Sequence, residues 1–277
     1  MIKLLKFIKR SLFRLIKKFW SSTVFLFQKQ STSIKIRGLN IGSGDSWTYW
    51  FWEGVDQMDG SYLDKNSILP YPNNSIELVY SSHFFEHVDN DTAYRLFSEI
   101  HRVLKPGGVF RILVPDFEKI QNTLVSKDMT LFKKIGFYAR PEWKSYGIAN
   151  SIENYVLHWF GNYQNHPYVI SEKMEKQKDF FRGPPKIDPN LVVEKAHTLG
   201  TLEFGKWVIK HIPTEHFANG GHINTWTHDK FSEMLKLKGF SSKKSSFSES
   251  KSKTMSFFDI VTDRKLITLY HEAYKKR

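Results

Sequence analysis

The 277-residue sequence contains no cysteine. This absence excludes a disulfide framework and a zinc site built on thiolates, because both need Cys side chains. The first 27 residues are rich in apolar side chains, yet lysines interrupt them before any run approaches the roughly 20 residues that a spanning helix needs. They also lack the uninterrupted apolar core of a secretory signal. We therefore expect a cytoplasmic protein.

Acidic residues are scarce at the start of the chain. The net charge is +13 and the isoelectric point is near 9.6. Seven cations and no acid precede Trp20, and their positions are Lys3, Lys6, Lys9, Arg10, Arg14, Lys17 and Lys18. Apolar residues alternate with these cations near one helical face. We interpret residues 1–30 as a basic amphipathic arm, in which residues 1–27 lie on an anionic membrane surface at the inner membrane face. The alternative is a helix packed on its own domain or on a partner.

The stretch from 36 to 116 carries most of the chemical information. Leu39 and Ile41 form a short apolar strand that runs into Gly42-Ser43-Gly44, and such a glycine turn lets a ligand approach bare backbone. A second short strand, 52–56, ends in Asp56. The segment 76–80 reads as a buried strand that is followed by Ser81, Ser82 and His83. From 91 to 104 apolar residues recur at helical spacing.

This order of elements predicts an α/β fold with a mostly parallel sheet. The helix is stopped by Lys105-Pro106-Gly107-Gly108, and another strand, 109–114, closes at Pro115-Asp116. Four segments read "LNIGSGD", "GVDQMD", "LDKNSILPYPNNSIELVYSSHFFEHV" and "IHRVLKPGGVFRILVPD". In this order and spacing they resemble the class I methyltransferases that use S-adenosylmethionine. The closest likeness is the small "type 11" branch associated with bacterial surface-polysaccharide synthesis.

The resemblance implies a Rossmann-like methyltransferase sheet, mostly parallel with an antiparallel final strand, with a helical insertion and an N-terminal amphipathic helix. The methyltransferase domain would span residues 34–277, with 117–215 as an insertion on the acceptor side. That insertion could instead be a structural cap or a dimer surface. The resemblance to the family resumes at Gly221-His222, and the tail from Met255 resembles the closing strands of the family's sheet. The intervening segment 241–253 reads as a polar, mobile loop.

The cofactor implied by the resemblance is S-adenosylmethionine. Gly42 and Gly44 would lie beside its methionine part. The alternative is that these glycines only shape the turn and contact no ligand. Asp56 would accept hydrogen bonds from the ribose hydroxyls, as a carboxylate at a strand end does in dinucleotide sites, unless it is merely an exposed turn residue. Asp64 matches the acid that faces the adenine amino group. Ser81 stands at the carboxyl end of a strand, where ligands of open α/β sheets bind.

Two histidines are candidates for the chemistry. His83 falls near the transferred methyl group and suits the role of base for a hydroxyl acceptor, or it fixes the loop. His222 is the second candidate on the acceptor side, or it braces its turn. Glu86 and His87 are expected to open the next helix. His83, Glu86 and His87 spell H-x-x-E-H, a zinc-peptidase pattern. We expect no metal, because His83 ends a strand and one helix would have to carry both histidines.

The sequence therefore predicts methyl transfer from S-adenosylmethionine to a small-molecule or glycolipid acceptor, at a hydroxyl of a saccharide or glycolipid. A non-catalytic scaffold that keeps the fold is the alternative, motivated by the glycine turn, which continues with Ser46 and Trp47 and lacks the third glycine of the fuller family pattern. A nucleic-acid methyltransferase is a third hypothesis, motivated by the net charge. We expect no nucleic-acid acceptor, because the charge clusters in an apolar arm and the strand end lacks the Asn/Asp-Pro-Pro-aromatic signature.

Overall fold

The chain is described from a computed structural model, which covers residues 37–44, 47, 49–58, 61–135, 151–161, 187–212, 221–262 and 265–276. The basic arm predicted for residues 1–30 lies outside these residues, and so do parts of the predicted insertion 117–215. Among the described residues, none of the helices combines the length and the hydropathy that crossing a membrane requires.

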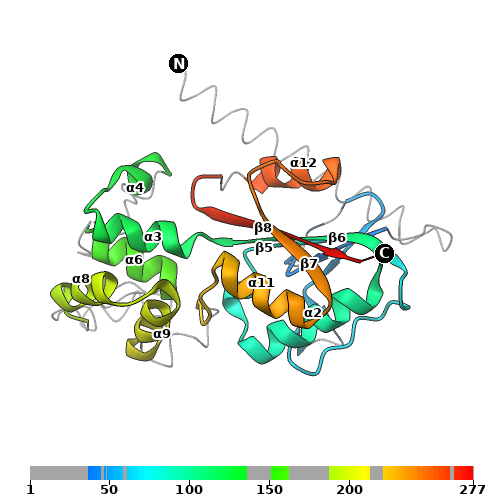
Figure 1. Cartoon of the computed structure of the whole chain (residues 1–277), viewed down its shortest axis with the longest axis horizontal. Coiled ribbons are helices and arrows are strands. Elements are labelled where there is room, and N and C mark those ends of the chain that lie inside the picture. Colours follow the sequence, from blue (N-terminus) through cyan, green and yellow to red (C-terminus); the bar gives the residue numbers. More distant parts are fainter. Residues whose placement is uncertain are drawn as a thin grey trace, which may run out of the picture.

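A six-stranded sheet forms the centre of the fold, with strand order β2-β1-β5-β6-β8-β7 (Figure 1). The strands are β1 (Gly38–Ile41), β2 (Trp52–Val55), β5 (Ile76–Ser82), β6 (Leu104–Pro115), β7 (Phe240–Ser245) and β8 (Thr268–Lys275). β1 pairs in parallel with β2 and β5, and β5 pairs in parallel with β6, whereas β8 runs antiparallel to both β6 and β7. This confirms the predicted sheet, which is mostly parallel with an antiparallel final strand. The short strands β3 (Gln57–Met58) and β4 (Ser61–Tyr62) form a separate antiparallel pair.

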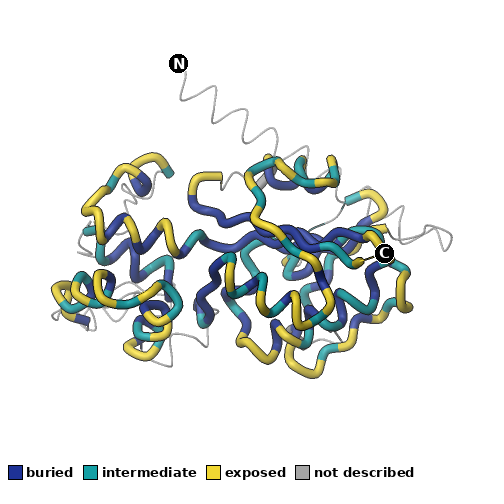
Figure 2. Tube along the Cα trace, in the orientation of Figure 1, coloured by how far each residue is buried: buried dark blue, intermediate teal, exposed yellow. Residues whose placement is uncertain are grey.

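Apolar side chains cover both faces of the sheet, and Figure 2 shows its strands largely in dark blue. Leu39, Ile41 and Val79 belong to the larger core, which α2 and α11 complete. Trp52 and Tyr80 belong to a smaller core on the opposite face, under α12. Burial on both faces explains why the central strands are rich in apolar residues without a clear alternation of apolar and polar positions.

The helix predicted for 91–104 is α2 (Asn90–Val103). The Asp89 carboxylate accepts a 2.7 Å hydrogen bond from the Thr92 N–H and so caps its first turn. The helix ends one residue earlier than predicted, because β6 begins at Leu104. Pro106 has no N–H to donate, and the pairing of β6 with β5 shifts register between Ile76 and Leu78. The Lys-Pro-Gly-Gly stop is therefore a bulge at the start of a strand.

Beyond the carboxyl end of β6, the chain forms a group of helices beside the sheet (Figure 1). They are α3 (Phe117–Val125), α4 (Thr130–Lys134), α6 (Ile152–Gly161), α8 (Pro189–Thr198) and α9 (Thr201–His211). Their buried residues, such as Phe160 and Phe204, join the larger core. The helical character of the predicted insertion is thus confirmed, and its role on the acceptor side stays a prediction.

The chain after Gly221 differs in two places from the prediction. α11 (His228–Leu237) is capped by Thr227, as expected. The segment 241–253, predicted as a mobile loop, instead contributes most of β7 and a turn. The tail from Met255 is predicted to form closing strands; its first part lies instead in α12 (Lys253–Thr262), whereas its last part forms the strand β8 as predicted. An edge strand rich in Ser and Lys is easily mistaken for a loop, because its exposed side chains carry no apolar alternation.

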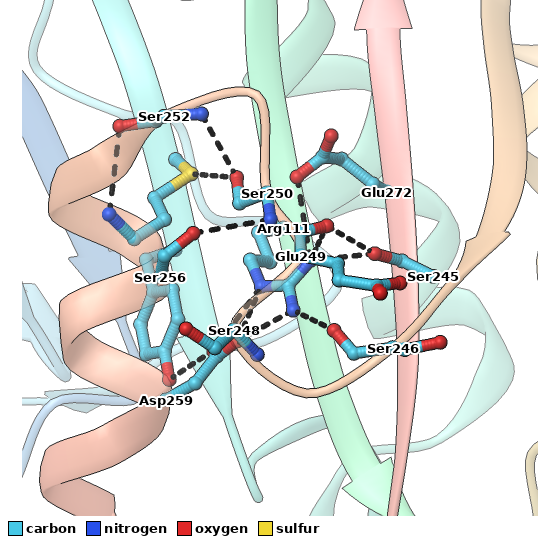
Figure 3. A network of polar contacts seen from close by, with 12 residues as sticks. Arg111, Ser245, Ser246, Ser248, Glu249, Ser250, Ser252, Ser256, Asp259 and Glu272 are labelled. Carbon is cyan, nitrogen blue, oxygen red and sulfur yellow. Dashed lines mark hydrogen bonds and ion pairs between the residues drawn. The ribbon is translucent and has the colours of Figure 1, made fainter.

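Arg111 explains why this turn is held in place (Figure 3). The side chain is fully buried, and its guanidinium pairs with the buried carboxylates of Asp259 on α12 and Glu272 on β8. It also donates to the carbonyl oxygens of Ser246 at 2.8 Å and Glu249 at 3.4 Å. A buried charge must be paired and hydrogen-bonded, so this network fixes α12 and the turn before it against the sheet.

Candidate functional site

The glycine turn lies between the ends of β1 and β2. Gly42 and Gly44 both have left-handed backbone, with φ of 71° and 69°. The Gly42 N–H donates a 2.8 Å hydrogen bond to the Val55 carbonyl oxygen, which brings the turn beside Asp56. A Cβ atom on Gly42 would lie 2.3 Å from Cγ of Phe84, whereas a Cβ on Gly44 would meet no described atom within 4 Å. Gly42 is therefore needed for packing, and Gly44 offers open backbone to a ligand.

The two predicted acids occupy different surroundings. Asp56 directly follows β2 and is partly exposed. Asp64 shapes its own loop, because its carboxylate accepts hydrogen bonds from the Asn66 N–H at 2.8 Å and the Ser67 hydroxyl at 3.1 Å. The backbone hydrogen bond of Asn66 is the main cause of its lowered pKa. Asp64 stays ionised and exposed, so its predicted contact with an adenine ring remains open.

Two residues of α2 hold the loop 69–75, which follows Asp64 and contains Pro70, Pro72 and Asn73, and the sequence reasoning missed both. The Glu99 carboxylate accepts a 2.9 Å hydrogen bond from the Leu69 N–H. Arg102 pairs with Glu99 at 2.6 Å and donates to the carbonyl oxygens of Tyr71 and Leu69 at 2.7 and 2.8 Å. The only local signal is a charged pair three residues apart on a helix whose other inner positions are apolar.

Ser81 lies in β5 between Ile41 of β1 and Ile112 of β6. Its side chain is completely buried, and its hydroxyl has no hydrogen-bond partner within the described part of the chain. A buried hydroxyl without a partner is costly, and a water molecule or a ligand atom would relieve that cost. Its role in holding a cofactor stays a prediction.

His83 follows the carboxyl end of β5, in left-handed backbone with φ of 54°. The backbone N–H of His83 donates a 2.8 Å hydrogen bond to the Leu113 carbonyl oxygen. Nδ1 lies 3.1 Å from Oε1 of Glu86, and Nε2 lies 3.1 Å from Oγ1 of Thr268 at the start of β8. An ionised carboxylate only accepts, so Nδ1 carries the proton. In the neutral ring Nε2 is then the acceptor, and the Thr268 hydroxyl donates to it.

Glu86 is a completely buried carboxyl in the short helix η1 (Phe85–His87). Burial alone would raise its pKa. The hydrogen bond from His83 and the electrostatic effect of the His83, His222 and His87 side chains outweigh burial and lower the pKa to about 2. Oε2 has no hydrogen-bond partner among the described residues. Glu86 therefore places a full negative charge between histidines that come from two distant parts of the chain.

His222 approaches Glu86 from the segment 221–227. The N–H groups of Ile223 and Asn224 donate to the Glu86 carbonyl oxygen at 2.8 and 3.1 Å, which fixes this segment along η1. Nδ1 of His222 lies 2.6 Å from the carbonyl oxygen of Trp159 in α6, so Nδ1 is the donor. Burial lowers the pKa of His222 to about 4, against the opposing charge of Glu86. The ring is neutral at pH 7, with a lone pair on Nε2.

One ligand atom each from Glu86, His87 and His222 could be shared with a metal ion, since these atoms lie within 4.8 Å of one another. The set differs from the H-x-x-E-H pattern, because His222 takes the place of His83. Tetrahedral zinc ligands bound at about 2.0–2.1 Å lie roughly 3.3 Å apart. Ligand atoms separated by as much as 4.8 Å are therefore more widely spaced than in a tetrahedral zinc site. The expectation of no metal therefore stays a prediction.

The structure thus gathers five of the seven predicted residues into two groups. Gly42, Gly44 and Asp56 lie together at the ends of β1 and β2, while His83 and His222 both neighbour Glu86. Phe84 links the groups, because its ring fills the space above Gly42. The sequence predicts only that Glu86 opens the next helix, and nothing in its local pattern indicates the approach of His222.

Residues 55–112 match the family model described as "Methyltransferase domain", which covers about a fifth of the chain. This segment contains Asp56, Asp64, Ser81 and His83. No curated protein matches the chain. The match therefore concerns the part of the fold that carries four of the seven predicted site residues.

Several solved structures are similar at low identity. An S-adenosylmethionine-dependent methyltransferase from Mesorhizobium loti has 15% identity, coverage of 90% of this chain and 96% of that chain, and a TM-score of 0.37. One from Archaeoglobus fulgidus has 13% identity, coverage of 98% and 99%, and a TM-score of 0.34. PKMT2 from Rickettsia typhi, in complex with AdoHcy, has 12% identity, coverage of 88% and 51%, and a TM-score of 0.38.

Proposed function

Since the chain carries an S-adenosylmethionine-dependent methyltransferase domain, we propose that it methylates a hydroxyl group of a saccharide or glycolipid. The observation that carries this proposal is the hydrogen-bonded pair of His83 and Glu86 at the carboxyl edge of the sheet. A hydroxyl acceptor benefits from a base, and a neutral histidine held by a carboxylate suits that task.

The residues at the ends of β1, β2 and β5 fit the cofactor. A Cβ on Gly44 would meet open space, and the buried hydroxyl of Ser81 has no partner among the described residues. Gly42 and Gly44 would leave room for the methionine part, Asp56 would hold the ribose, Asp64 would face the adenine, and Ser81 would contribute its hydroxyl. When bound, S-adenosylmethionine supplies an electrophilic methyl group on a sulfonium, whose thioether departs neutral and needs no proton.

His83 is proposed as the base. Its Nε2 atom accepts from the Thr268 hydroxyl, which an acceptor hydroxyl could replace without any change in the tautomer. The acceptor proton would then move to Nε2 as the oxygen attacks the methyl carbon. The charge of Glu86, 3.1 Å from Nδ1, would stabilise the resulting imidazolium.

His222 is proposed as the second histidine of the acceptor side. It is neutral, and the Trp159 carbonyl oxygen fixes its tautomer so that Nε2 can accept a hydrogen bond. This link to α6 also connects the site to the helices of the insertion. We propose that these helices, within residues 117–215, bind the acceptor.

The saccharide class and the membrane location rest on weaker support. The former rests on the resemblance of the motif series to the polysaccharide-associated branch. The latter rests on the basic amphipathic pattern of residues 1–27. A lipid-linked saccharide would combine both, because its acceptor hydroxyl is presented at an anionic surface.

The experiment is a transfer assay with the full chain and S-adenosylmethionine labelled in the methyl group. A cell-envelope glycolipid fraction, total protein and total RNA are offered separately. We expect a base-stable label in the glycolipid fraction, recovered as an O-methyl sugar after hydrolysis. Label found in protein or RNA, with none in the glycolipid fraction, would refute the proposed acceptor class.

A further inference from the structure

A patch of exposed large apolar side chains lies on the α12 face of the domain. Trp50 and Phe51 are 50% and 44% exposed, and Phe257 and Ile260 of α12 are 44% and 54% exposed. We call these four residues the aromatic patch. Large apolar groups that gather on one face mark an interaction surface, whereas scattered single ones do not.

Two elements build the aromatic patch. The Trp52 N–H donates a 3.0 Å hydrogen bond to the Tyr49 carbonyl oxygen, which closes a tight turn with Trp50 and Phe51 at its tip. Phe51 adopts a left-handed backbone with φ of 61°, which is unfavourable for a bulky side chain. On α12, Phe257 and Ile260 are three residues apart and share the outward face. A strained turn that displays two aromatic side chains is a feature that packing alone does not require.

The two elements pack against each other. The ring of Phe258, on the inner side of α12, makes edge contacts with Tyr49 and Trp52, both at centroid distances of 4.9 Å. Tyr49 also lies 6.4 Å from Phe257, so the turn and the helix are adjacent at the surface. The aromatic patch is therefore a preformed surface.

The part of the chain before Arg37 joins the fold at this patch. The Arg37 N–H donates a 2.8 Å hydrogen bond to the Phe51 carbonyl oxygen. The preceding 36 residues contain nine lysines and arginines, and no acidic residue occurs before Asp45. The exposed Lys253 lies on the outward face of α12, one turn before Phe257. The sequence leading into Arg37 is thus strongly basic, and Arg37 itself contacts the turn that displays Trp50 and Phe51; basic residues together with exposed aromatic side chains are the combination that binds an anionic bilayer surface.

We propose that the aromatic patch inserts into the interfacial region of an anionic membrane, beside the basic segment before Arg37. Trp50 and Phe51 at the turn tip and Phe257 and Ile260 on α12 would enter the boundary between headgroups and acyl chains. This inference shares its membrane location with the proposed function, but it concerns binding alone and does not require methyl transfer.

The test uses the absence of cysteine in the chain. Phe257→Cys in the full chain is labelled with an environment-sensitive fluorophore, and Leu237→Cys is the matched control. Leu237 is 71% exposed on α11, which covers the opposite face of the sheet. With vesicles of phosphatidylcholine and phosphatidylglycerol, we expect a blue shift and a rise in intensity at position 257 and no change at 237.

Three results would overturn the proposal. The label at 257 could stay unchanged while the protein sediments with vesicles, or both labels could respond equally. The label at 257 could also report an apolar surrounding before vesicles are added, which would mean that the basic segment or a second copy covers the patch.

A second measurement guards against a fluorophore that itself drives insertion. The unlabelled double variant Phe257→Gln/Ile260→Gln should need a roughly tenfold higher vesicle concentration for half-maximal sedimentation. Leu237→Gln should match the wild type. Equal sedimentation of all three would contradict the proposal. Affinity for S-adenosylmethionine without vesicles is measured in parallel, so that failure of the proposed function is recognised separately.

Discussion

The Nδ1 atom of His83 lies 3.1 Å from Oε1 of Glu86, and its Nε2 atom lies 3.1 Å from the hydroxyl of Thr268. The fully buried carboxylate of Glu86 therefore fixes the tautomer of His83. The other ring nitrogen, Nε2, accepts from the Thr268 hydroxyl, which the hydroxyl of a methyl acceptor could replace. Glu86→Gln keeps the size of the side chain and removes its charge. We expect the single-turnover rate of methyl transfer to fall by about 10²–10³, within the range for general-base catalysis, with affinity for S-adenosylmethionine unchanged.

Two control variants separate this role from a structural one. The exposed Glu233→Gln should leave the rate unchanged. Thr268→Val removes the hydroxyl that competes for Nε2 and should retain most of the activity. If Glu86→Gln weakens cofactor binding as much as it slows transfer, Glu86 acts on the fold of the site and not on the base.

Chelation tests the cluster of Glu86, His87 and His222. Because its ligand atoms are spread over as much as 4.8 Å, we expect the protein to work without a metal ion. Prolonged dialysis against EDTA should change neither the transfer rate nor the melting temperature. A loss that zinc restores, together with about one equivalent of metal in the untreated protein, would refute the metal-free account.

The Arg111 network predicts a large effect on stability (Figure 3). Asp259→Ala would leave a fully buried guanidinium without the carboxylate that it contacts at 2.5 and 3.1 Å. We expect a loss of about 3–5 kcal/mol in the free energy of unfolding, measured by urea denaturation. The control is Glu249→Ala, because Glu249 offers Arg111 only its backbone carbonyl oxygen. A loss for Asp259→Ala no larger than that of the control would mean that the network contributes little.

Buried neutral histidines predict acid sensitivity. Burial lowers the pKa of His222 to about 4 and that of His271 to about 3, below the ordinary value near 6.5. The unfolded chain therefore binds more protons between pH 6.5 and 4, so stability is full above pH 6.5 and falls as the pH drops through this window. Glu86, with a pKa of about 2, adds a further loss below pH 4.5.

Urea midpoints from pH 7.5 to 4.5 measure this dependence. His222→Gln should reduce the slope between pH 6.5 and 4.5, because one titrating group is removed. His197→Gln, at an exposed position on α8, is the control and should keep the wild-type slope. An unchanged slope in His222→Gln would show that His222 does not remain neutral when folded.

The predictable part of the fold is the part whose signals are local. β1, β5 and β6 are short segments rich in apolar residues, and α2 carries its cap and its apolar face within 15 residues of sequence. The candidate residues at strand ends follow from the same reasoning, because parallel strands deliver their carboxyl ends to one edge.

The rest depends on contacts between distant segments. The approach of His222 to Glu86 is set by hydrogen bonds from Ile223 and Asn224, which no local pattern encodes. In the same way, β7 and α12 are fixed by Arg111, and the sequence shows there only a polar run followed by Met255 and Phe258. A buried arginine is unusual enough that its partners must be found in the fold.

The most direct test of the account is a calorimetric titration of S-adenosylmethionine into the wild-type chain and the Asp56→Ala variant. We predict clear binding to the wild type. The variant should bind more weakly by roughly 1.5–3 kcal/mol, the scale for hydrogen bonds to a charged group, which is about a 10- to 150-fold rise in Kd. No binding to the wild type, or equal affinity in the variant, would contradict the cofactor site proposed at the ends of β1 and β2.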